Sequence, residues 1–519
     1  MKKIIGVFIC MLLIGTFFPS VSATYIYFKS NIFQNVGSIN SEWTIMVHMN
    51  GDNDLESAGI DDFLEMSSVG STDEVNIVVQ FDRIAGFSEE YDNWNTTKRY
   101  IISKDMTPDN ANAIIDLGEI NMGDPQTAID FINWAVDNYP ANHYCIIFWD
   151  HGTGWKDGEN DRLLKGLSQD WTDNDKIMLD ELANILQEIT DNGNNPIDLI
   201  GFDSCRMQMI EVAYELSNFG VYMTGSEESE HSDGWAYDVF LSKLIDEPSM
   251  SPENLGEEIV NSYEGSTMST ISLDLIYDLS MEVSNFGEVL QDEENRETIY
   301  SLARITKSYF DQDYKDLFDF TDKLIGYQDM ITNPDIIQEA LDVQIKIEET
   351  VKSTKNIGAK SHGISIYLPI DSYLKQYDNI EFALDTQWDE FLKWLCSGQV
   401  NNPPENPFIT GPTSIKIGKE YEYTFSATDP DEDDVYFIVN WGDGTGTGMS
   451  GPISSGGELI LNHTWINSDS CCVSAICQDS NSQFSDWSIL LISISKSKII
   501  SSQILNQLFS RLILFDFLQ

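Results

Sequence analysis

The stretch Cys145-Ile146-Ile147-Phe148-Trp149-Asp150-His151-Gly152 places an apolar run directly before an aspartate, a histidine and a glycine. The same arrangement recurs at residues 197–205, where IDLIGFD is followed by Ser204 and Cys205. Short apolar runs that end at polar residues or glycine are typical of buried β-strands. We therefore predict two strands whose carboxyl ends carry His151 and Cys205.

Strand-like and helix-like segments alternate from about residue 41 to residue 397. Strand patterns lie at residues 43–49, 75–81, 100–103, 144–149, 197–202, 221–224 and 363–368. The 3.6-residue spacing of amphipathic helices lies at residues 54–67, 125–139, 179–191 and 207–218. This alternation predicts an α/β fold in which a mostly parallel sheet carries helices on both faces. Ligands of such sheets bind beyond the carboxyl ends of the strands, so candidate functional residues lie just after each strand.

The chain is strongly acidic. Its 519 residues include 29 Lys and Arg against 85 Asp and Glu, which gives a formal net charge of -56. Such a charge repels nucleic acid phosphates and anionic lipid headgroups, so we expect neither as a partner. Cationic substrates, bound calcium and simple solvation of an extracellular surface remain as explanations.

The first 23 residues have the features of a signal peptide. Lys2 and Lys3 precede an apolar stretch at residues 4–18, and Val21-Ser22-Ala23 forms a small-residue cleavage site. No later apolar run has the roughly 20 residues that a membrane helix needs. The sequence therefore predicts a secreted or cell-surface protein without a transmembrane span.

The composition changes after residue 397. A linker rich in Pro and Asn leads into short alternating strands separated by turn signals. This pattern predicts an immunoglobulin-like β-sandwich. A cell-surface molecule is a candidate ligand of this domain. Its acidic turn at residues 429–434 and its WGDGT segment at residues 441–445 resemble PKD modules, and the turn either binds calcium or is simply solvated. The predicted order is signal peptide 1–23, N-terminal segment 24–41, α/β domain 42–397, linker 398–407, β-sandwich 408–496 and C-terminal tail 497–519.

Six cysteines remain after Cys10 leaves with the signal peptide, and they show no paired CxxC spacing. This scatter argues against a disulfide-rich scaffold and against a structural zinc site. The spacing allows one local bridge among Cys471, Cys472 and Cys477. Cys145, inside an apolar run, is predicted to be a buried hydrophobe.

His151 and Cys205 are the candidates for chemistry. If a helix begins near residue 207, its N-terminus favours the Cys205 thiolate, and a histidine reaching it across the sheet edge supplies an acid/base. The 54 residues between them leave room for one crossover helix and a loop. A buried structural cysteine and an unrelated loop histidine are the alternative that the pattern leaves open.

Several motifs occur together in a characteristic order. They are WTIMVHMNGDNDLE at residues 43–56, DHG at 150–152, DSC at 203–205, GSE at 225–227, DGW at 233–235, and GISIYLP at 363–369 with Trp388. Together they resemble the clostripain family, which belongs with caspases, legumains and gingipains. The resemblance covers about residues 42–396 and implies a caspase-like fold and a cysteine endopeptidase with a His–Cys dyad.

The resemblance implies a role for each matching residue. Cys205 corresponds to the nucleophile and His151 to the general acid/base, while the backbone N–H groups of Gly152 and Cys205 form the oxyanion hole. Asp203 and Asp233 match acidic residues of the P1 pocket, which implies cleavage after Arg or Lys. For Asp203, an N-cap of the following helix is the alternative.

Members of the family are often cut between the histidine and the cysteine, and we expect self-cleavage between Lys165 and Gly166, with an ordinary loop as the alternative. No cofactor is required for the chemistry. Calcium is needed by some relatives, and Asp52 and Asp54 are candidate ligands. Arg206, a large cation directly after the nucleophile, either lowers the thiol pKa or blocks the cleft.

A different class of function is an exported binding or adhesion protein with an inactive peptidase-like domain. It predicts no thiol reactivity at Cys205, and the presence of both His151 and Cys205 speaks against it. A metal-dependent hydrolase is disfavoured because the chain has no HExxH motif, and a serine hydrolase because no GxSxG follows a strand.

Overall fold

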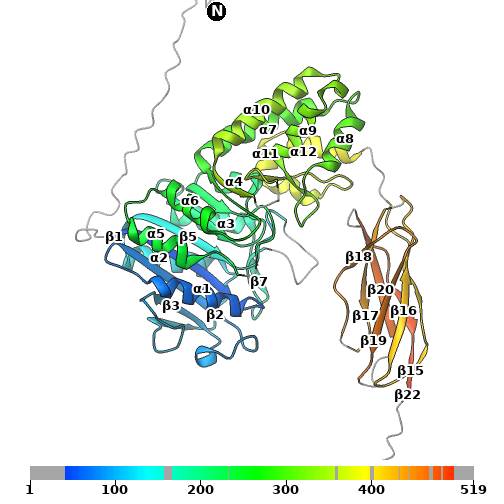
Figure 1. The fold of residues 1–519 in the computed structure, drawn as a ribbon, viewed down its shortest axis with the longest axis horizontal. Coiled ribbons are helices and arrows are strands. Elements are labelled where there is room, and N and C mark those ends of the chain that lie inside the picture. The colour runs from blue at the N-terminus through cyan, green and yellow to red at the C-terminus, as the bar shows by residue number, and fades with distance from the viewer. Residues whose placement is uncertain are drawn as a thin grey trace, which may run out of the picture. The chain divides into compact units, whose positions relative to one another are not determined.

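The computed structural model describes residues 41–156, 166–231, 233–356, 360–397, 402–431, 433–443, 445–466, 472–480 and 483–495. The predicted signal peptide, the C-terminal tail, Lys165 and Cys471 lie outside the described residues. Figure 1 shows the course of the chain through an α/β region and a separate β-domain.

A nine-stranded sheet organises the α/β region, with the strand order β12-β10-β9-β8-β5-β1-β2-β3-β4. Its strands are β1 (Ser41–Gly51), β2 (Val75–Arg83), β3 (Thr97–Ile101), β4 (Ile115–Gly118), β5 (Ala141–Trp149), β8 (Ile197–Asp203), β9 (Gly220–Gly225), β10 (Thr267–Ser272) and β12 (Val351–Asn356). The central five strands, β9 to β2, pair in parallel, and the outer strands pair antiparallel. The predicted mostly parallel sheet is therefore confirmed.

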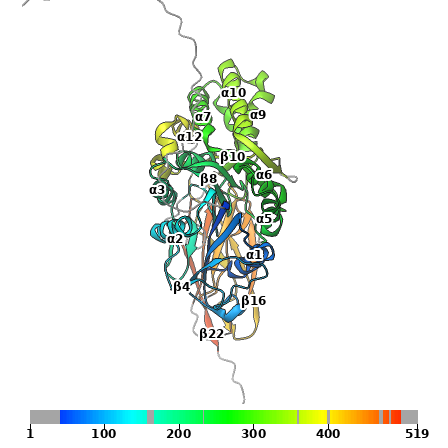
Figure 2. The same ribbon diagram turned by 90° about the vertical axis from the view of Figure 1, so that its left-hand side faces the viewer.

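Helices cover both faces of the sheet, as Figure 2 shows, and this too confirms the prediction. One face carries α2 (Pro125–Asn138), α3 (Leu179–Ile189) and α4 (Ile210–Leu216), and the other carries α1 (Glu56–Val69), α5 (Tyr237–Asp246) and α6 (Pro252–Ser262). The central strands alternate between these two apolar clusters: Ile200 and Phe202 belong to one, Leu199 to the other. Burial on both faces explains why these strands are continuous apolar runs in the sequence.

A helical group extends the domain beyond α4 and β12 (Figure 1). It contains α7 (Ile276–Leu290), α8 (Arg296–Ile305), α9 (Leu317–Gly326), α10 (Pro334–Thr350), α11 (Glu381–Asp385) and α12 (Trp388–Ser397). The strand predicted at residues 363–368 is shorter, β13 (Ser365–Tyr367), and it lies outside the main sheet. It pairs antiparallel with β11 (Tyr314–Asp316) in a sheet of its own.

A short hairpin, β6 (Leu167–Asp170) and β7 (Asp175–Ile177), was missed by the sequence pattern. Residues 408–495 form the predicted β-sandwich, whose larger sheet has the order β18-β17-β20-β21. The strands are β14 (Phe408–Thr410), β15 (Ser414–Lys416), β16 (Glu420–Ser426), β17 (Val435–Asn440), β18 (Ser450–Ile453), β19 (Glu458–Thr464), β20 (Cys472–Asp479), β21 (Ser488–Leu491) and β22 (Ser493–Ser495). Their inward residues form a core with Trp441 and Trp465 at its centre.

None of the described helices combines the length and the apolar character that crossing a lipid bilayer requires.

A buried ion pair joins the start of α1 to the end of β2. Arg83 Nε lies 2.7 Å from Glu56 Oε1, and neither side chain is exposed. Arg83→Met leaves the Glu56 carboxylate buried without its cation, so the free energy of unfolding should fall by about 3 to 5 kcal/mol. Urea unfolding of the full chain measures this loss. Lys346→Met, which breaks an exposed pair with Glu349, should cost less than about 1 kcal/mol, and equal losses would contradict the assignment.

Candidate active site

Two neighbouring strands bring His151 and Cys205 to one edge of the sheet. β5 and β8 pair in parallel with Trp149 opposite Asp203, and the Asp150 N–H donates to the Asp203 carbonyl at 3.3 Å. Each candidate residue follows its paired strand position by two residues. The two therefore leave the sheet at the same level, on adjacent strands.

Gly152 lies against the backbone of the cysteine. A Cβ at this position would lie 2.5 Å from the Cys205 carbonyl oxygen, so only glycine fits here. Among the described residues, the backbone N–H groups of Gly152 and Cys205 donate to no other group. Two free N–H groups on adjoining segments are the arrangement that an oxyanion hole needs.

The Cys205 thiol is half-buried, and its Sγ accepts a hydrogen bond from the Glu230 backbone N–H at 3.2 Å. Cys145, predicted to be buried, is buried, and burial raises its thiol pKa well above the ordinary value. Cys472 and Cys477 are not joined to each other by a disulfide, and Cys471 lies outside the described residues.

The helix expected directly after the cysteine begins later. α4 starts at Ile210, with Met209 as its N-cap residue. The intervening segment is held by neighbouring strands instead: Gln208 N–H donates to the Ser226 carbonyl, and Met209 forms a bridge with Ser365. Cys205 is thus not in a first helical turn, and the N-cap alternative for Asp203 is wrong.

His151 has a carboxylate partner. Its Nε2 lies 2.9 Å from Asp54 Oδ1, on the turn between β1 and α1. The buried Asp150 fixes this turn, because its carboxylate accepts from Asn53 Nδ2 at 2.8 Å and from the Gln169 N–H. Burial raises the pKa of Asp150 to about 7. Asp54 is therefore a partner of the histidine, a role that the sequence did not predict, and its role as a calcium ligand stays a prediction.

Arg206 binds across the strand ends. Its backbone has φ 61°, and its Nη2 donates to the Gly152 carbonyl at 3.1 Å while the guanidinium lies over Phe310. The side chain is only 9% exposed. The large cation thus fastens the segment after His151 to the segment after Cys205.

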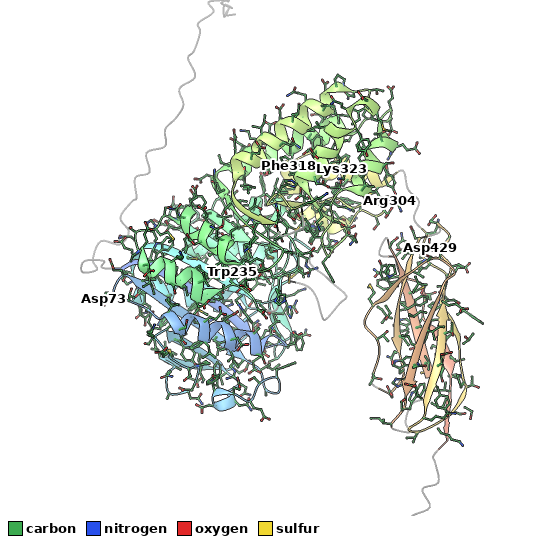
Figure 3. All side chains as sticks on the ribbon, in the orientation of Figure 1. Asp73, Trp235, Arg304, Phe318, Lys323 and Asp429 are labelled. Atoms are coloured by element: carbon green, nitrogen blue, oxygen red, sulfur yellow. The ribbon has the colours of Figure 1, made fainter. Side chains whose placement is uncertain are left out.

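Three carboxylates lie buried beside the nucleophile, and we call Asp62, Asp203 and Glu230 the buried acidic triad. Asp203 Oδ2 accepts from the Tyr237 hydroxyl at 2.9 Å, and Asp62 Oδ2 accepts from Trp149 Nε1 at 2.6 Å. Trp235, labelled in Figure 3, lies on the segment between β9 and α5, and its backbone N–H donates to Asp203 Oδ2 at 3.4 Å.

Burial raises the pKa of every member of the triad, and the charge of Asp203 adds to the effect at Asp62 and Glu230. Burial raises the pKa of Asp203 to about 6, and hydrogen bonds to its carboxylate partly offset this rise. Burial and the Asp203 charge hold the pKa values of Asp62 and Glu230 well above their usual range. The triad is therefore partly protonated near neutral pH, and a bound cation would favour its ionised form.

Asp233, the second predicted pocket residue, is exposed and lies 3.4 Å from His231 Nδ1 through Oδ2. Asp233 lines an open pocket of about 790 Å³ whose wall is formed mainly by residues of α1. The other carboxylates of this open pocket are Asp54, Asp61, Asp62, Glu65 and Asp238. The open pocket is thus lined both by Asp54, the partner of His151, and by Asp62, one member of the buried acidic triad.

The predicted processing site is only partly described. Lys165 lies outside the described residues, whereas the Gly166 N–H donates to Thr153 Oγ1 at 2.9 Å. Gly166 has φ 113°, a conformation that favours glycine, and it directly precedes β6.

Comparison with known proteins identifies the family. The model of the Peptidase_C11 family, described as the clostripain family, matches residues 47–394. The chain belongs to the clostripain family. This confirms the resemblance drawn from the motifs.

The individual relatives of this clostripain-family chain share only part of its sequence or structure. Clostripain from Hathewaya histolytica is 29% identical over 194 residues, which cover 34% of this chain and 36% of that protein, about a third of its length. The solved structure of a secreted C11 cysteine protease from Bacteroides thetaiotaomicron, "iotapain", is 14% identical, covers 67% of this chain and 99% of its own, and has a TM-score of 0.51. A PKD domain of an M14-like peptidase from Thermoplasmatales archaeon SCGC AB-540-F20 is 39% identical, covers 19% of this chain and 100% of its own, and has a TM-score of 0.18.

The sequence missed Asp54, Asp62 and Glu230 as members of this site. Asp54 follows a strand, and this position is the signal in the sequence that points to it. Asp62 lies in mid-helix, where an acidic residue is expected to face solvent, and its burial is visible only in the packing of α1 against Trp149.

The buried acidic triad should destabilise the folded chain as the pH rises. A carboxyl whose pKa is raised on folding stabilises the fold below its unfolded pKa of about 4 and loses that contribution as the pH passes the folded value. Asp62→Asn should therefore raise stability on the order of 1 to 3 kcal/mol at pH 8 and by much less at pH 5. Thermal unfolding at both pH values measures this. Asp61→Asn, on the exposed side of α1, is the matched control, and an Asp62 gain independent of pH would contradict the assignment.

Proposed function

We propose that this clostripain-family chain is a secreted cysteine endopeptidase that cleaves after Arg or Lys with Cys205 and His151. The observation that carries the proposal is the position of these residues at the same level of adjacent parallel strands, next to a buried acidic triad. Family membership supports peptidase chemistry on protein or peptide substrates. The acidic triad supports the choice of a basic residue.

The reaction would proceed by covalent catalysis. The Cys205 sulfur attacks the scissile carbonyl carbon, the carbonyl becomes an oxyanion, and the thiol proton passes to His151. Collapse of this intermediate breaks the C–N bond, and the imidazolium gives its proton to the leaving amine. Water then hydrolyses the acyl thioester and restores the thiol.

The free N–H groups of Gly152 and Cys205 would bind the oxyanion. Loss of one such donor typically costs about 3 to 4 kcal/mol of transition-state stabilisation. Their spacing depends on the close contact between Gly152 and the Cys205 carbonyl, and Arg206 holds the same two segments together. Asp54 would orient the imidazole and stabilise its protonated form.

A substrate guanidinium or ammonium would enter beside Cys205 and neutralise the buried acidic triad. The three carboxylates lie close together, and within the described residues none of them forms an ion pair with Lys or Arg. A guanidinium offers five donors in a planar fork, which matches carboxylate acceptors. The pocket would therefore recognise a basic side chain through carboxylate charges that are costly to bury when no cation is bound.

The test compares peptide reporters with Arg, Lys, Gln and Asp at P1. The full chain should hydrolyse the Arg and Lys reporters, and Cys205→Ala should lose about 10³-fold or more in kcat/KM. Asp203→Asn should lower kcat/KM for Arg at least about 30-fold, because the cation then lacks its buried partner, with little change for Gln.

Cys472→Ala is the matched control, since it removes another half-buried thiol from the separate β-domain. Full activity of Cys205→Ala would exclude the nucleophile. Cleavage only after Asp would exclude the pocket assignment, and no thiol reactivity at Cys205 would favour the binding-protein alternative.

We also propose that the exported chain activates itself by cutting between Lys165 and Gly166. Lys165 offers the basic P1 residue that the acidic triad would select, and β6 begins directly after the bond. N-terminal sequencing of purified protein should find a fragment that starts at Gly166 in the wild type and none in Cys205→Ala. Equal cutting in both forms would contradict self-processing.

The β-domain would bind a cell-surface ligand. Strand β21 is an edge strand, and Trp487, Ile489 and Leu491 on and beside it are each at least half exposed. A row of exposed apolar side chains on an edge strand is a surface suited to a partner.

A further inference from the structure

The segment that follows the candidate histidine, residues 153–156, packs against the small β11–β13 sheet. The Thr153 carbonyl accepts a hydrogen bond from the Tyr314 hydroxyl at 2.6 Å. The Trp155 side chain is buried and packs edge-on against the Tyr367 ring, with the two ring centres 4.7 Å apart. This sheet therefore contacts the part of the chain that directly follows one N–H donor of the candidate oxyanion hole.

Lys156, the last residue of this segment, forms a double ion pair. Its Nζ lies 2.8 Å from Asp311 Oδ2 and 3.0 Å from Asp313 Oδ2, and its side chain is only 17% exposed. Burial by itself would lower the pKa of the ammonium, but the charges of Asp313 and Asp311 outweigh burial and raise this pKa above the ordinary value. Lys156 is therefore charged and paired at neutral pH.

Both carboxylates belong to residues 306–313, which we call the anchoring loop. The Asp313 N–H donates to Asp311 Oδ1 at 3.0 Å, and the Asp313 carbonyl accepts from the Leu368 N–H at 2.8 Å. The loop leads directly into β11, which is paired with β13. Hydrogen bonds from two directions thus fix the carboxylates to which Lys156 binds.

The anchoring loop also reaches the cysteine side of the site. The Phe310 ring centre lies 5.4 Å from the Arg206 guanidinium carbon, and the Phe310 N–H donates to Glu228 Oε1 at 2.8 Å. Arg206 donates from Nη2 to the Gly152 carbonyl, and its backbone N–H donates to the Glu228 carbonyl at 3.0 Å. One loop therefore contacts the segment after β5 through Lys156 and the segment after β8 through Arg206.

We propose that Lys156 is a positioning residue of the peptidase reaction, because its ion pairs with the anchoring loop hold His151 and Gly152 at the level of Cys205. This inference rests on the proposed function of Cys205 and His151. Lys156 acts through the backbone that joins it to Gly152. A misplacement of about 1 Å in an active site can cost on the order of 10²-fold in rate, so a fixed backbone here matters for the chemistry.

The position of Lys156 in the chain lets the anchor persist after processing. The Thr153 hydroxyl donates to the Lys156 carbonyl at 3.1 Å and accepts from the Gly166 N–H at 2.9 Å. The proposed cut follows Lys165, so Lys156 stays covalently joined to Gly152 in the cut chain. The histidine segment would therefore keep its ion pairs before and after the cut.

Kinetics of the full chain on the Arg reporter test the proposal. Lys156→Met should lower kcat at least about 10-fold and leave KM within about twofold, because the anchor does not contact the bound substrate. Lys156→Arg keeps a cation that can pair with the two carboxylates, so it should recover most of the lost kcat. Lys323, labelled in Figure 3, forms a partly buried pair with Asp319 in α9, and Lys323→Met is the matched control that should keep the parent kcat.

Backbone hydrogen exchange supplies a readout that needs no peptidase activity. The amides of residues 151–156 should exchange at least about 10-fold faster in Lys156→Met than in the parent, and at the parent rate in Lys323→Met. If Lys156→Met does not fold, Asp311→Asn takes its place. That variant removes one of the two carboxylates, so it should lower kcat by a smaller factor, about 3-fold or more, again without a change in KM.

Several outcomes would overturn the positioning role. They are a change in KM alone, an equal loss of kcat in Lys323→Met, no recovery in Lys156→Arg, and an unchanged kcat despite faster exchange. Unchanged exchange at residues 151–156 in Lys156→Met would overturn the anchor itself. A parent that cleaves no reporter would contradict the proposed function instead, and the exchange rates would still decide whether Lys156 holds this segment.

Discussion

The parallel pairing of β5 with β8 is the constraint on which the candidate site depends. Its register sets Trp149 opposite Asp203, and from that pair the chain reaches His151 and Cys205 in two residues on each strand. A slip of one residue would turn one of the two onto the other face of the sheet. The apolar runs of both strands, buried on both faces, make such a slip costly. The same register of β5 and β8 is thus needed both to bury the apolar side chains and to bring His151 and Cys205 to the same level.

Charge is concentrated inside this domain as well as on its surface. The buried acidic triad lies on the face of the sheet that carries Leu199, and a second acidic cluster, Asp52, Asp82, Glu119 and Asp170, lies on the face that carries Val78. Burial and nearby like charges raise the pKa values of Asp62 and Asp82, and neither side chain forms an ion pair with Lys or Arg within the described part of the chain.

The turn between β1 and α1 contacts both the candidate active site and the β6–β7 hairpin. Asn53 bonds to Asp150 and to the hairpin β6–β7, and Asp54 bonds to His151. A carboxylate oxygen of Asp52 lies within 4.8 Å of one from each of Asp82, Glu119 and Asp170. Three successive residues therefore reach three different parts of the molecule. Such a turn couples the position of the imidazole to the hairpin that follows the proposed processing bond. Rigid strands on either side give the turn its fixed ends.

The sequence alone determined the mostly parallel sheet, its two covered faces, the β-sandwich and the family, because apolar periodicity and ordered motifs are local properties. It also placed His151 and Cys205 at strand ends. It misjudged the start of α4, since the segment after Cys205 is held by Ser226 and Ser365, which are distant in the chain. Only the tertiary structure decided that Asp62 and Glu230 are buried beside Asp203 and that Asp82, Glu119 and Asp170 join Asp52. Carboxylates look alike in a sequence, and whether one is solvated or buried depends on which distant segments pack against it.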